Sequence, residues 1–206
     1  TLGPAPALNH MRDYLNPDWV AQRLQRKITS DEDAVQFGSR MPAFGFTAEQ
    51  ANAITAYLFQ SSTNPQPNAE LALEGNSKAG KTVFASVGCV ACHQADGLGK
   101  STLFDGGKLD DIAQKRRTDF WQVWFEHPAR ANSHHRMPTV DLTATQRSDV
   151  IAYLKSLADD TSELDIPQFV FDEPLAEKGK KLYDTHRCAS CHEAKPITNT
   201  VVFDVD

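Results

Sequence analysis

The sequence predicts an all-α fold with long loops. Apolar residues recur at helical spacing in two similar segments. They are Ala53, Ile54 and Tyr57 in the first segment, and Val150, Ile151 and Leu154 in the second. Thr47 and Thr143 precede these segments, in the position of residues that cap a helix N-terminus. No strand-like alternation of apolar and polar residues continues over several segments, so no β-sheet architecture is expected.

The composition fits a globular chain and argues against two classes of partner. The 206 residues are 40% hydrophobic and 23% charged, which suits burial of a core. The longest apolar candidate, near residues 83–92, is short of the roughly 18 residues of a membrane span, and Ser86 and Gly88 interrupt it. The net charge of −6 argues against nucleic-acid binding and favours a partner with a basic patch.

Helices that contain tryptophan are expected before the two capped segments. Residues 17–24 contain Trp19, and residues 119–125 contain Trp121 and Trp124. These aromatic side chains are expected in the core, packed on a large apolar body.

The capped segments belong to an internal repeat that begins with methionine. Met41 and Met137 are each followed by proline, and Tyr57 and Tyr153 follow 16 residues after them. Each copy therefore predicts a loop that presents a methionine, followed by a terminal helix. Met11 lacks this context and is expected to pack in a core.

All four cysteines lie in two copies of the motif C-x-x-C-H. The copies are Cys89, Cys92 and His93, and Cys188, Cys191 and His192. This motif is the attachment signature of c-type haem. Two thiols three residues apart on one helical turn can reach the vinyl groups at one haem edge, and the next imidazole then lies under the iron. Both motifs have a glycine nine residues and an aromatic five residues before the first cysteine, which argues against chance.

Two other interpretations of the cysteines remain open. A zinc site built from two C-x-x-C pairs would use four thiolates, but it leaves both adjacent histidines unexplained. Redox-active or structural disulfides are the second interpretation, and a thioredoxin-like motif would need a βαβ pattern that is absent.

These motifs, in this order, resemble the class I c-type cytochrome family in a tandem, multihaem form. The family unit runs from a glycine- and aromatic-containing helix through C-x-x-C-H to a Met-Pro loop and a final helix, and residues 75–158 contain one complete unit. The resemblance implies cytochrome c-like helical domains wrapped around covalently bound haem. It implies two haem c groups, held by Cys89, Cys92, Cys188 and Cys191.

The resemblance also implies the iron ligands of the complete unit, His93 and Met137, a pairing that raises the reduction potential. His134 and His135 are the rival candidates for the position of Met137. In many family members a proline carbonyl orients the proximal histidine, but no proline lies between His93 and Pro128. Another carbonyl is therefore expected to orient His93.

Basic residues near the Met137 loop are candidates for pairing with haem propionates, and a solvated basic face is the alternative. These candidates are Arg116, Arg117, Arg130 and Arg136.

The parts of the repeat follow one another along the chain in an unusual order. They are a Met-containing half-domain at residues 1–62, a linker at 63–74, the complete domain at 75–158, a linker at 159–171 and a haem-attachment half-domain at 172–206. The halves are complementary, so Met41 is expected to ligate the iron bound by His192. Pairing within one chain would give a monomer with a permuted domain. Pairing between chains would give head-to-tail self-association into a ring or filament.

The function implied is electron transfer rather than catalysis. When protein fills both axial positions, substrate cannot reach the iron, and one-electron exchange with redox partner proteins remains. The alternative is a di-haem peroxidase-like enzyme with an open haem site on His192, although the chain is short for that class. Haem is attached to this motif outside the bacterial cytoplasmic membrane, so a periplasmic or extracellular location is expected.

Overall fold

The computed structural model describes residues 5, 7–9, 11–26, 41–62, 74–102, 105–117, 120–132, 135–158 and 172–192. Apart from Glu74, the expected linkers at 63–74 and 159–171 lie outside this described part. The fold is all-α, as predicted.

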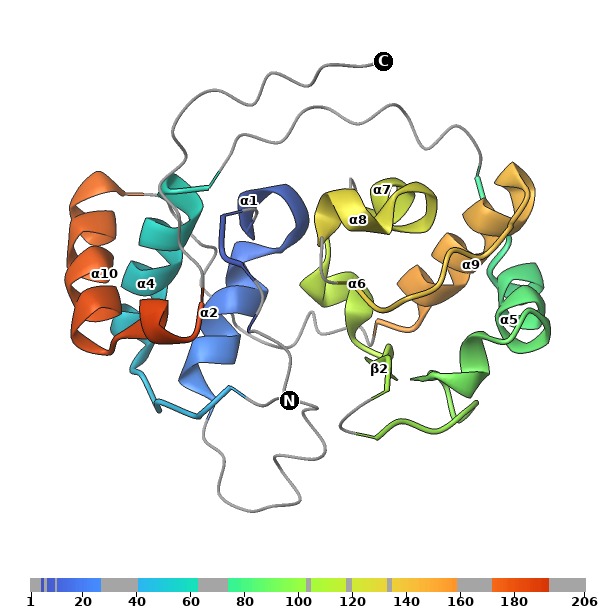
Figure 1. Cartoon of the computed structure of the whole chain (residues 1–206), viewed down its shortest axis with the longest axis horizontal. Helices are drawn as coiled ribbons and strands as arrows, with labels where there is room; N and C mark the ends of the chain where they lie inside the picture. The colour runs from blue at the N-terminus through green and yellow to red at the C-terminus, as the bar shows by residue number, and fades with distance from the viewer. Residues whose placement is uncertain are drawn as a thin grey trace.

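Two groups of helices lie side by side (Figure 1). The first group consists of α1 (Met11–Tyr14), α2 (Pro17–Gln25), α4 (Ala48–Gln60) and, from the far end of the chain, α10 (Glu173–Thr185) with the short turn η3 (Cys188–Ser190). The second group consists of α5 (Ser77–Ser86), the turn η1 (Cys89–Ala91), α6 (Ile112–Lys115), α7 (Phe120–Glu126), α8 (Pro128–Ala131) and α9 (Ala144–Ser156).

Helices α4 and α9 begin with the same cap. The Thr47 side chain accepts a hydrogen bond from the Gln50 backbone N–H, while the Gln50 side chain accepts one from the Thr47 backbone. Thr143 and Gln146 form the same reciprocal pair in α9. Such a capping box satisfies two backbone donors that the helix itself cannot pair, and losing the cap residue typically costs about 1 kcal/mol. The predicted N-cap residues are therefore confirmed.

Each group of helices has its own hydrophobic core. Ile54 and Leu58 of α4 pack with Val20 of α2 and Tyr183 of α10 in the first core. The second core has the same plan and joins α5, α7 and α9. Its buried residues include Phe84, Phe120, Trp121, Val150 and Leu154. The tryptophan helices predicted at 17–24 and 119–125 correspond to α2 and α7, and Trp121 is buried as expected.

A glycine permits a close helix contact in both groups. A Cβ atom on Gly80 of α5 would lie 1.9 Å from the Asp149 carbonyl oxygen of α9. A Cβ atom on Gly179 of α10 would lie 1.8 Å from the Ala53 carbonyl oxygen of α4. Both carbonyls lie 12 residues after the repeat methionine, so the two helix pairs meet in the same register.

Aromatic contacts repeat the same correspondence. The rings of Phe84 and Tyr153 lie 5.5 Å apart at 58°. The rings of Tyr183 and Tyr57 lie 5.3 Å apart at 57°. The pair α10–α4 is therefore packed like the pair α5–α9, although its two helices come from opposite ends of the chain.

A short stretch of backbone joins the two groups. Leu15 and Arg116 form an isolated antiparallel bridge. Beside it, the Asn16 N–H donates to the Lys115 carbonyl over 3.0 Å. The Tyr14 ring meets Phe120 edge-on, with 5.8 Å between the centroids. Residues 14–16 of the first group thus dock directly on the end of α6 and the start of α7.

One parallel pair of strands was not expected from the sequence. β1 (His93–Gln94) pairs with β2 (Gly107–Lys108), and His93 is aligned with Gly107. Each strand has two residues, which is too short for an alternating pattern to appear in the sequence.

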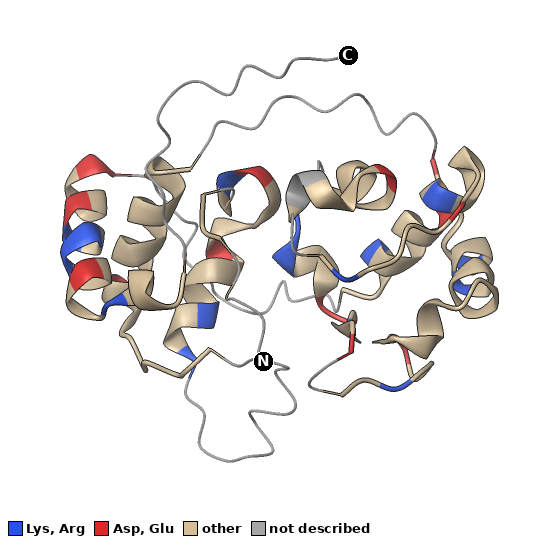
Figure 2. Ribbon diagram, in the orientation of Figure 1, with Lys and Arg blue, Asp and Glu red and all other residues tan. Residues whose placement is uncertain are grey.

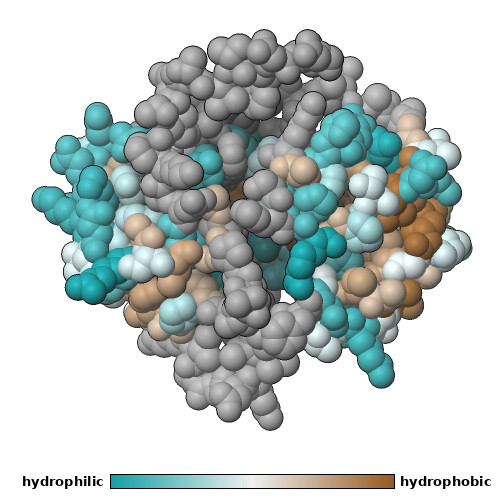
Figure 3. Space-filling view, viewed as in Figure 1, coloured by the Kyte–Doolittle hydropathy of each residue, from teal (hydrophilic) through white to brown (hydrophobic). Residues whose placement is uncertain are grey.

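The surface of the molecule differs between its two ends. The outer face of α10 is hydrophilic, whereas apolar residues gather over the α5–α9 side (Figure 3). Among the described residues, no helix has the length and apolar character needed to cross a membrane.

Candidate functional site

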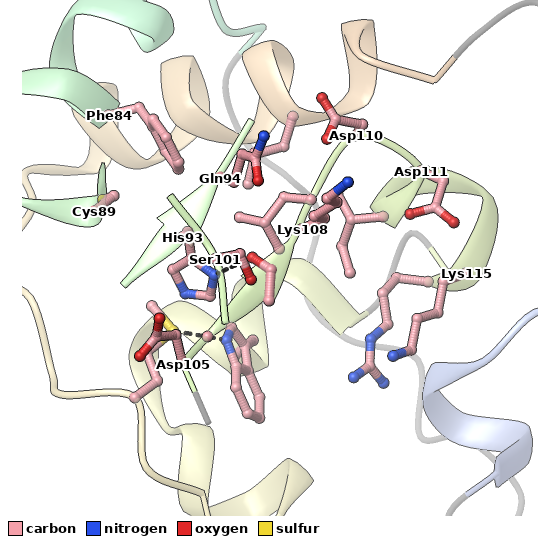
Figure 4. Close-up of a pocket in the computed structure, with 18 of the residues that line it drawn as sticks. Phe84, Cys89, His93, Gln94, Ser101, Asp105, Lys108, Asp110, Asp111 and Lys115 are labelled. Carbon is pink, nitrogen blue, oxygen red and sulfur yellow. Dashed lines mark hydrogen bonds between the residues drawn. The ribbon is translucent and has the colours of Figure 1, made fainter. Parts of the chain in front are cut away.

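A cavity of about 780 Å³ lies within the second group of helices. This volume falls in the range of roughly 300–1,000 Å³ that is typical of ligand sites. Aromatic and aliphatic side chains form much of the wall, among them Phe84, Trp121, Trp124, Phe125, Val150 and Leu154. The predicted site residues Cys89, His93 and Met137 line the same cavity. Figure 4 shows Cys89 and Phe84 at one end of it, and Asp111 and Lys115 at the other.

His93 is held by the strand pair. Its Nδ1 lies 3.3 Å from the Gly107 carbonyl oxygen, which can only accept, so Nδ1 carries the hydrogen. Nε2 is then the unprotonated nitrogen, the one able to bind a metal. Gly106 packs flat on the imidazole, because a Cβ atom there would lie 2.3 Å from Cε1 of the ring. Burial lowers the pKa of His93, while hydrogen bonds to Gly107 and Gly106 oppose the shift.

Met137 faces the cavity from the loop that precedes α9. The indole Nε1–H of Trp124 donates a hydrogen bond to its sulfur over 2.9 Å. His135, a rival ligand candidate, has its Nδ1 3.0 Å from the Met137 carbonyl oxygen and its ring 6.2 Å from that of Trp124. His134, the other rival, lies outside the described residues.

The first cysteine pair lies on the turn η1, at the end of α5. Gly88 begins the turn in a left-handed conformation with φ of 96°. The Cys92 N–H donates to the Cys89 carbonyl over 3.2 Å. Cys89 is half-buried, and burial raises the pKa of its thiol, whereas Cys92 is exposed. The Cys89 side chain therefore lines the cavity, and that of Cys92 is exposed to solvent.

Residues 77–158 match the family model for cytochrome c. The matched segment contains Cys89, Cys92, His93 and Met137 in the family's order. It supports haem c as the cofactor of this domain and haem-based electron transfer as its function. Cytochromes c are generally electron carriers rather than enzymes, and such domains are typically exported. No curated protein and no solved structure matched the chain.

The residues of this cytochrome c domain fit covalent haem. Two thiols suit covalent attachment of the haem vinyl groups, and one neutral imidazole with an unprotonated nitrogen and one thioether sulfur suit the two axial positions of the iron. The apolar wall suits the porphyrin face, and the glycine at position 106 leaves room for the imidazole to stand beside the strand.

The second C-x-x-C-H lies on a turn of the same shape, outside the matched segment. Arg187 begins η3 with φ of 54°, in place of the glycine that begins η1. Cys188 is half-buried and Cys191 is exposed, and burial raises the pKa of the Cys188 thiol. His192 is half-buried, and its N–H donates to the Cys188 carbonyl over 3.0 Å.

Met41 and Cys188 pack against the same core, that of the first group of helices. The loop after Met41 also contacts the end of α10. The His186 ring lies 4.8 Å from that of Phe46 and 6.0 Å from that of Phe44, edge-on in both cases. The structure thus brings the methionine loop of the first half next to the cysteine turn of the last half.

The four cysteines do not gather in one place. Within the described ranges, which include all four, no group of three or more His, Cys, Asp or Glu side chains is arranged to hold a metal ion. A single zinc site using both pairs therefore finds no support in this fold.

Two partners of the site residues were not identified from the sequence. A carbonyl other than proline was expected to orient His93, and Gly107 supplies it, 14 residues along the chain. Trp124 was assigned to the core, yet its indole also contacts Met137. No local pattern marks either contact, because both depend on how loops fold over the cavity.

Proposed function

We propose that the chain is a di-haem c-type cytochrome that carries single electrons between redox partner proteins. The observation that supports it most is the meeting of Cys89, His93 and Met137 on one apolar cavity within a cytochrome c domain. His93 and Met137 are the proposed axial ligands of the haem attached to Cys89 and Cys92. When bound, haem supplies an iron centre that gains or loses one electron.

Neighbouring groups hold the two proposed iron ligands in place. The Gly107 carbonyl fixes the His93 ring and directs Nε2 away from the strand pair. The Trp124 indole holds the Met137 sulfur by one lone pair and leaves another for a metal. The aromatic side chains of the wall would cover a bound porphyrin and so limit the rearrangement that accompanies a change of charge.

For the second haem, we propose attachment at Cys188 and Cys191, with His192 and Met41 as ligands. Residues 1–62 and 172–206 would then be the two halves of one cytochrome c domain, completed within a single chain. The matched registers of α10–α4 and α5–α9 support this arrangement. So does the shared packing of Met41 and Cys188 on one core.

The proposed partners are redox proteins with basic docking patches, met in a periplasmic or extracellular compartment. The net charge of −6 supports an electrostatic encounter. Partner contacts of this kind are small and short-lived, as rapid electron exchange requires.

The test is the mass and absorption spectrum of the purified protein. Two haems should add to the polypeptide mass, and both should be six-coordinate and low-spin. A mass with one haem, or with zinc, would contradict the di-haem proposal. A high-spin haem on the second motif would instead favour the peroxidase-like enzyme.

A further inference from the structure

Four basic side chains gather where α2 meets α6, at the boundary between the two groups of helices. Arg23 lies in α2 and Arg26 directly follows it, while Lys115 ends α6 and Arg116 follows it. Figure 2 shows basic residues on both elements where they adjoin. Arg26, Lys115 and Arg116 also line the cavity of the cytochrome c domain.

The positive charges of this cluster outnumber the negative charge of Asp111, which lies beside them. Burial, followed by the charges of Arg116 and Arg23, lowers the pKa of Lys115 to about 7, while Asp111 opposes the shift. Burial likewise lowers the pKa of Arg23 to about 10, with Arg26 adding to the shift and Asp111 opposing it. Among the charges that act on Lys115 and Arg23 in the described part of the chain, three arginines outnumber the one carboxylate, Asp111, and this excess of positive charge favours an anionic ligand.

Aromatic rings contact two of the cations, but a ring offers them no oxygen. Lys115 Nζ lies 4.9 Å from the centroid of the Trp19 ring, and Arg116 Cζ lies 4.0 Å from that of Phe120. In the described part of the chain, Arg116 Nε is buried and has no hydrogen-bond partner. A buried donor of this kind is normally satisfied, so Arg116 Nε can take an acceptor beyond those that the described residues supply.

We propose that the cluster binds a pair of carboxylates, the propionates of the haem attached to Cys89 and Cys92, so that α2 of one group completes the haem site of the other. The inference rests on the proposed function of residues 75–158. Haem carries its propionates on the edge opposite its vinyl groups. In the cavity, Cys89 lies at one end and Lys115 at the other (Figure 4).

This assignment differs from the expectation drawn from the sequence. Of the four arginines considered there, Arg116 belongs to the cluster, while Arg23, Arg26 and Lys115 are additional. Guanidinium groups suit the task, because their N–H donors match carboxylate geometry. Since Arg23 and Arg26 belong to the first group, haem binding in the second group also stabilises the docking of residues 11–26.

The experiment uses the full haem-containing chain, with the haem isotopically labelled in its propionate carboxylates. Infrared titration follows the protonation of those carboxylates in the native protein and in the double variant Arg23→Gln/Arg26→Gln. Removing two cations should raise the pKa of at least one propionate by about 1 pH unit or more. The double variant Arg23→Lys/Arg26→Lys retains the charges and should stay closer to the native protein. The matched control Arg12→Gln, an exposed arginine of α1, should change nothing.

Each outcome separates this inference from the proposed function. Propionates that titrate identically in the native protein and the Gln variant overturn the inference, even if the protein carries two haems. If instead added phosphate stabilises the native protein but not the Gln variant while the propionates stay unchanged, the cluster binds a free anion, which also overturns the assignment. A mass without haem on Cys89 and Cys92 would overturn the proposed function itself. If the Gln variant fails to fold, Lys115→Met tests the same prediction from the other group of helices.

Discussion

His93 and Met137 are each held in place by a hydrogen bond to a neighbouring group. In each residue one electron pair that could bind a metal stays unused, on Nε2 of His93 and on the sulfur of Met137. The Gly107 carbonyl accepts from His93 Nδ1, and the Trp124 indole donates to the Met137 sulfur. A hydrogen bond to the sulfur withdraws electron density from it, and hydrogen bonds to metal ligands are among the means by which a protein tunes a haem potential. Trp124 is therefore expected to favour the ferrous state of the proposed haem.

Replacing Met137 by His should keep the haem on Cys89 and Cys92 low-spin and lower its reduction potential. Imidazole stabilises ferric iron more than a thioether does. Potentiometric titration of the purified variant measures the change. As a control, His135→Asn should leave the potential close to native, because His135 contacts the backbone of Met137 rather than its sulfur. A shift with His135→Asn, and none with Met137→His, would make His135 the ligand.

At the scale of elements, two long helices were predictable, and their partners were not. The repeat of threonine, apolar spacing and tyrosine predicts α4 and α9, since those signals are local. The glycine at nine residues before each first cysteine was visible as a repeat, but its role depends on a carbonyl in another helix. The strand pair β1–β2 and its contact with His93 were not predictable for the same reason.

Gly179→Ala should destabilise the packing of α10 on α4. The added methyl group would lie 1.8 Å from the Ala53 carbonyl oxygen, so the helices must separate, at a typical cost of about 1–3 kcal/mol for overpacking. Gly80→Ala should act alike on α5 and α9. Denaturant unfolding followed by circular dichroism gives the change, and Lys181→Ala on the exposed face of α10 is the control. If the Gly179 variant were as stable as this control, the close approach of the two helices would be wrong.

The buried Tyr183 phenol makes the α10–α4 packing sensitive to alkaline pH. Burial is the main cause that raises its pKa to about 12, and its hydroxyl has no hydrogen-bond partner among the described residues. An unfolded tyrosine loses its proton near pH 10. Between about pH 10 and 12 the unfolded chain thus binds fewer protons, and stability falls as pH rises.

Tyr183→Phe should reduce this loss of stability between pH 10 and 12. Unfolding free energies measured at intervals from pH 9 to 12 should decline less steeply in the variant than in the native protein. Glu177→Gln, at an exposed position of α10, is the control, because it leaves both phenols of this ring pair in place. An equal decline in the native protein and the Tyr183 variant would assign the pH dependence to other groups.

At the scale of the whole molecule, the first group of helices is assembled from both ends of the chain. The cytochrome c domain lies between these two parts in the sequence. Residues 14–16 attach the first group to α6 and α7 through backbone hydrogen bonds, and α10 joins this group from the C-terminal side. The alternating order of the motifs could be read from the sequence. The packing of α10 on α4 could not, since motif order carries no distance information.

Deleting residues 1–62 should turn the haem on Cys188 and Cys191 high-spin. The deletion removes Met41 and leaves His192 as the remaining proposed ligand. The haem on Cys89 and Cys92 should stay low-spin, because His93 and Met137 lie outside the deleted segment. Absorption spectra of the truncated and full-length proteins make the comparison, with Met41→Ala as the milder variant. Two low-spin haems in the truncated protein would show that the second iron has another ligand and that the halves do not form one haem domain.

The packing of α4 against α10 also dictates an order of folding. More than 110 residues separate the ends of these helices along the chain, so their contact closes a very long loop, which slows folding. The cytochrome c domain lies entirely inside that loop and can fold first. Until α10 has been synthesised, the face of α4 that packs against α10 is uncovered, and a chain emerging from the ribosome or a translocation channel would be prone to aggregate at that stage.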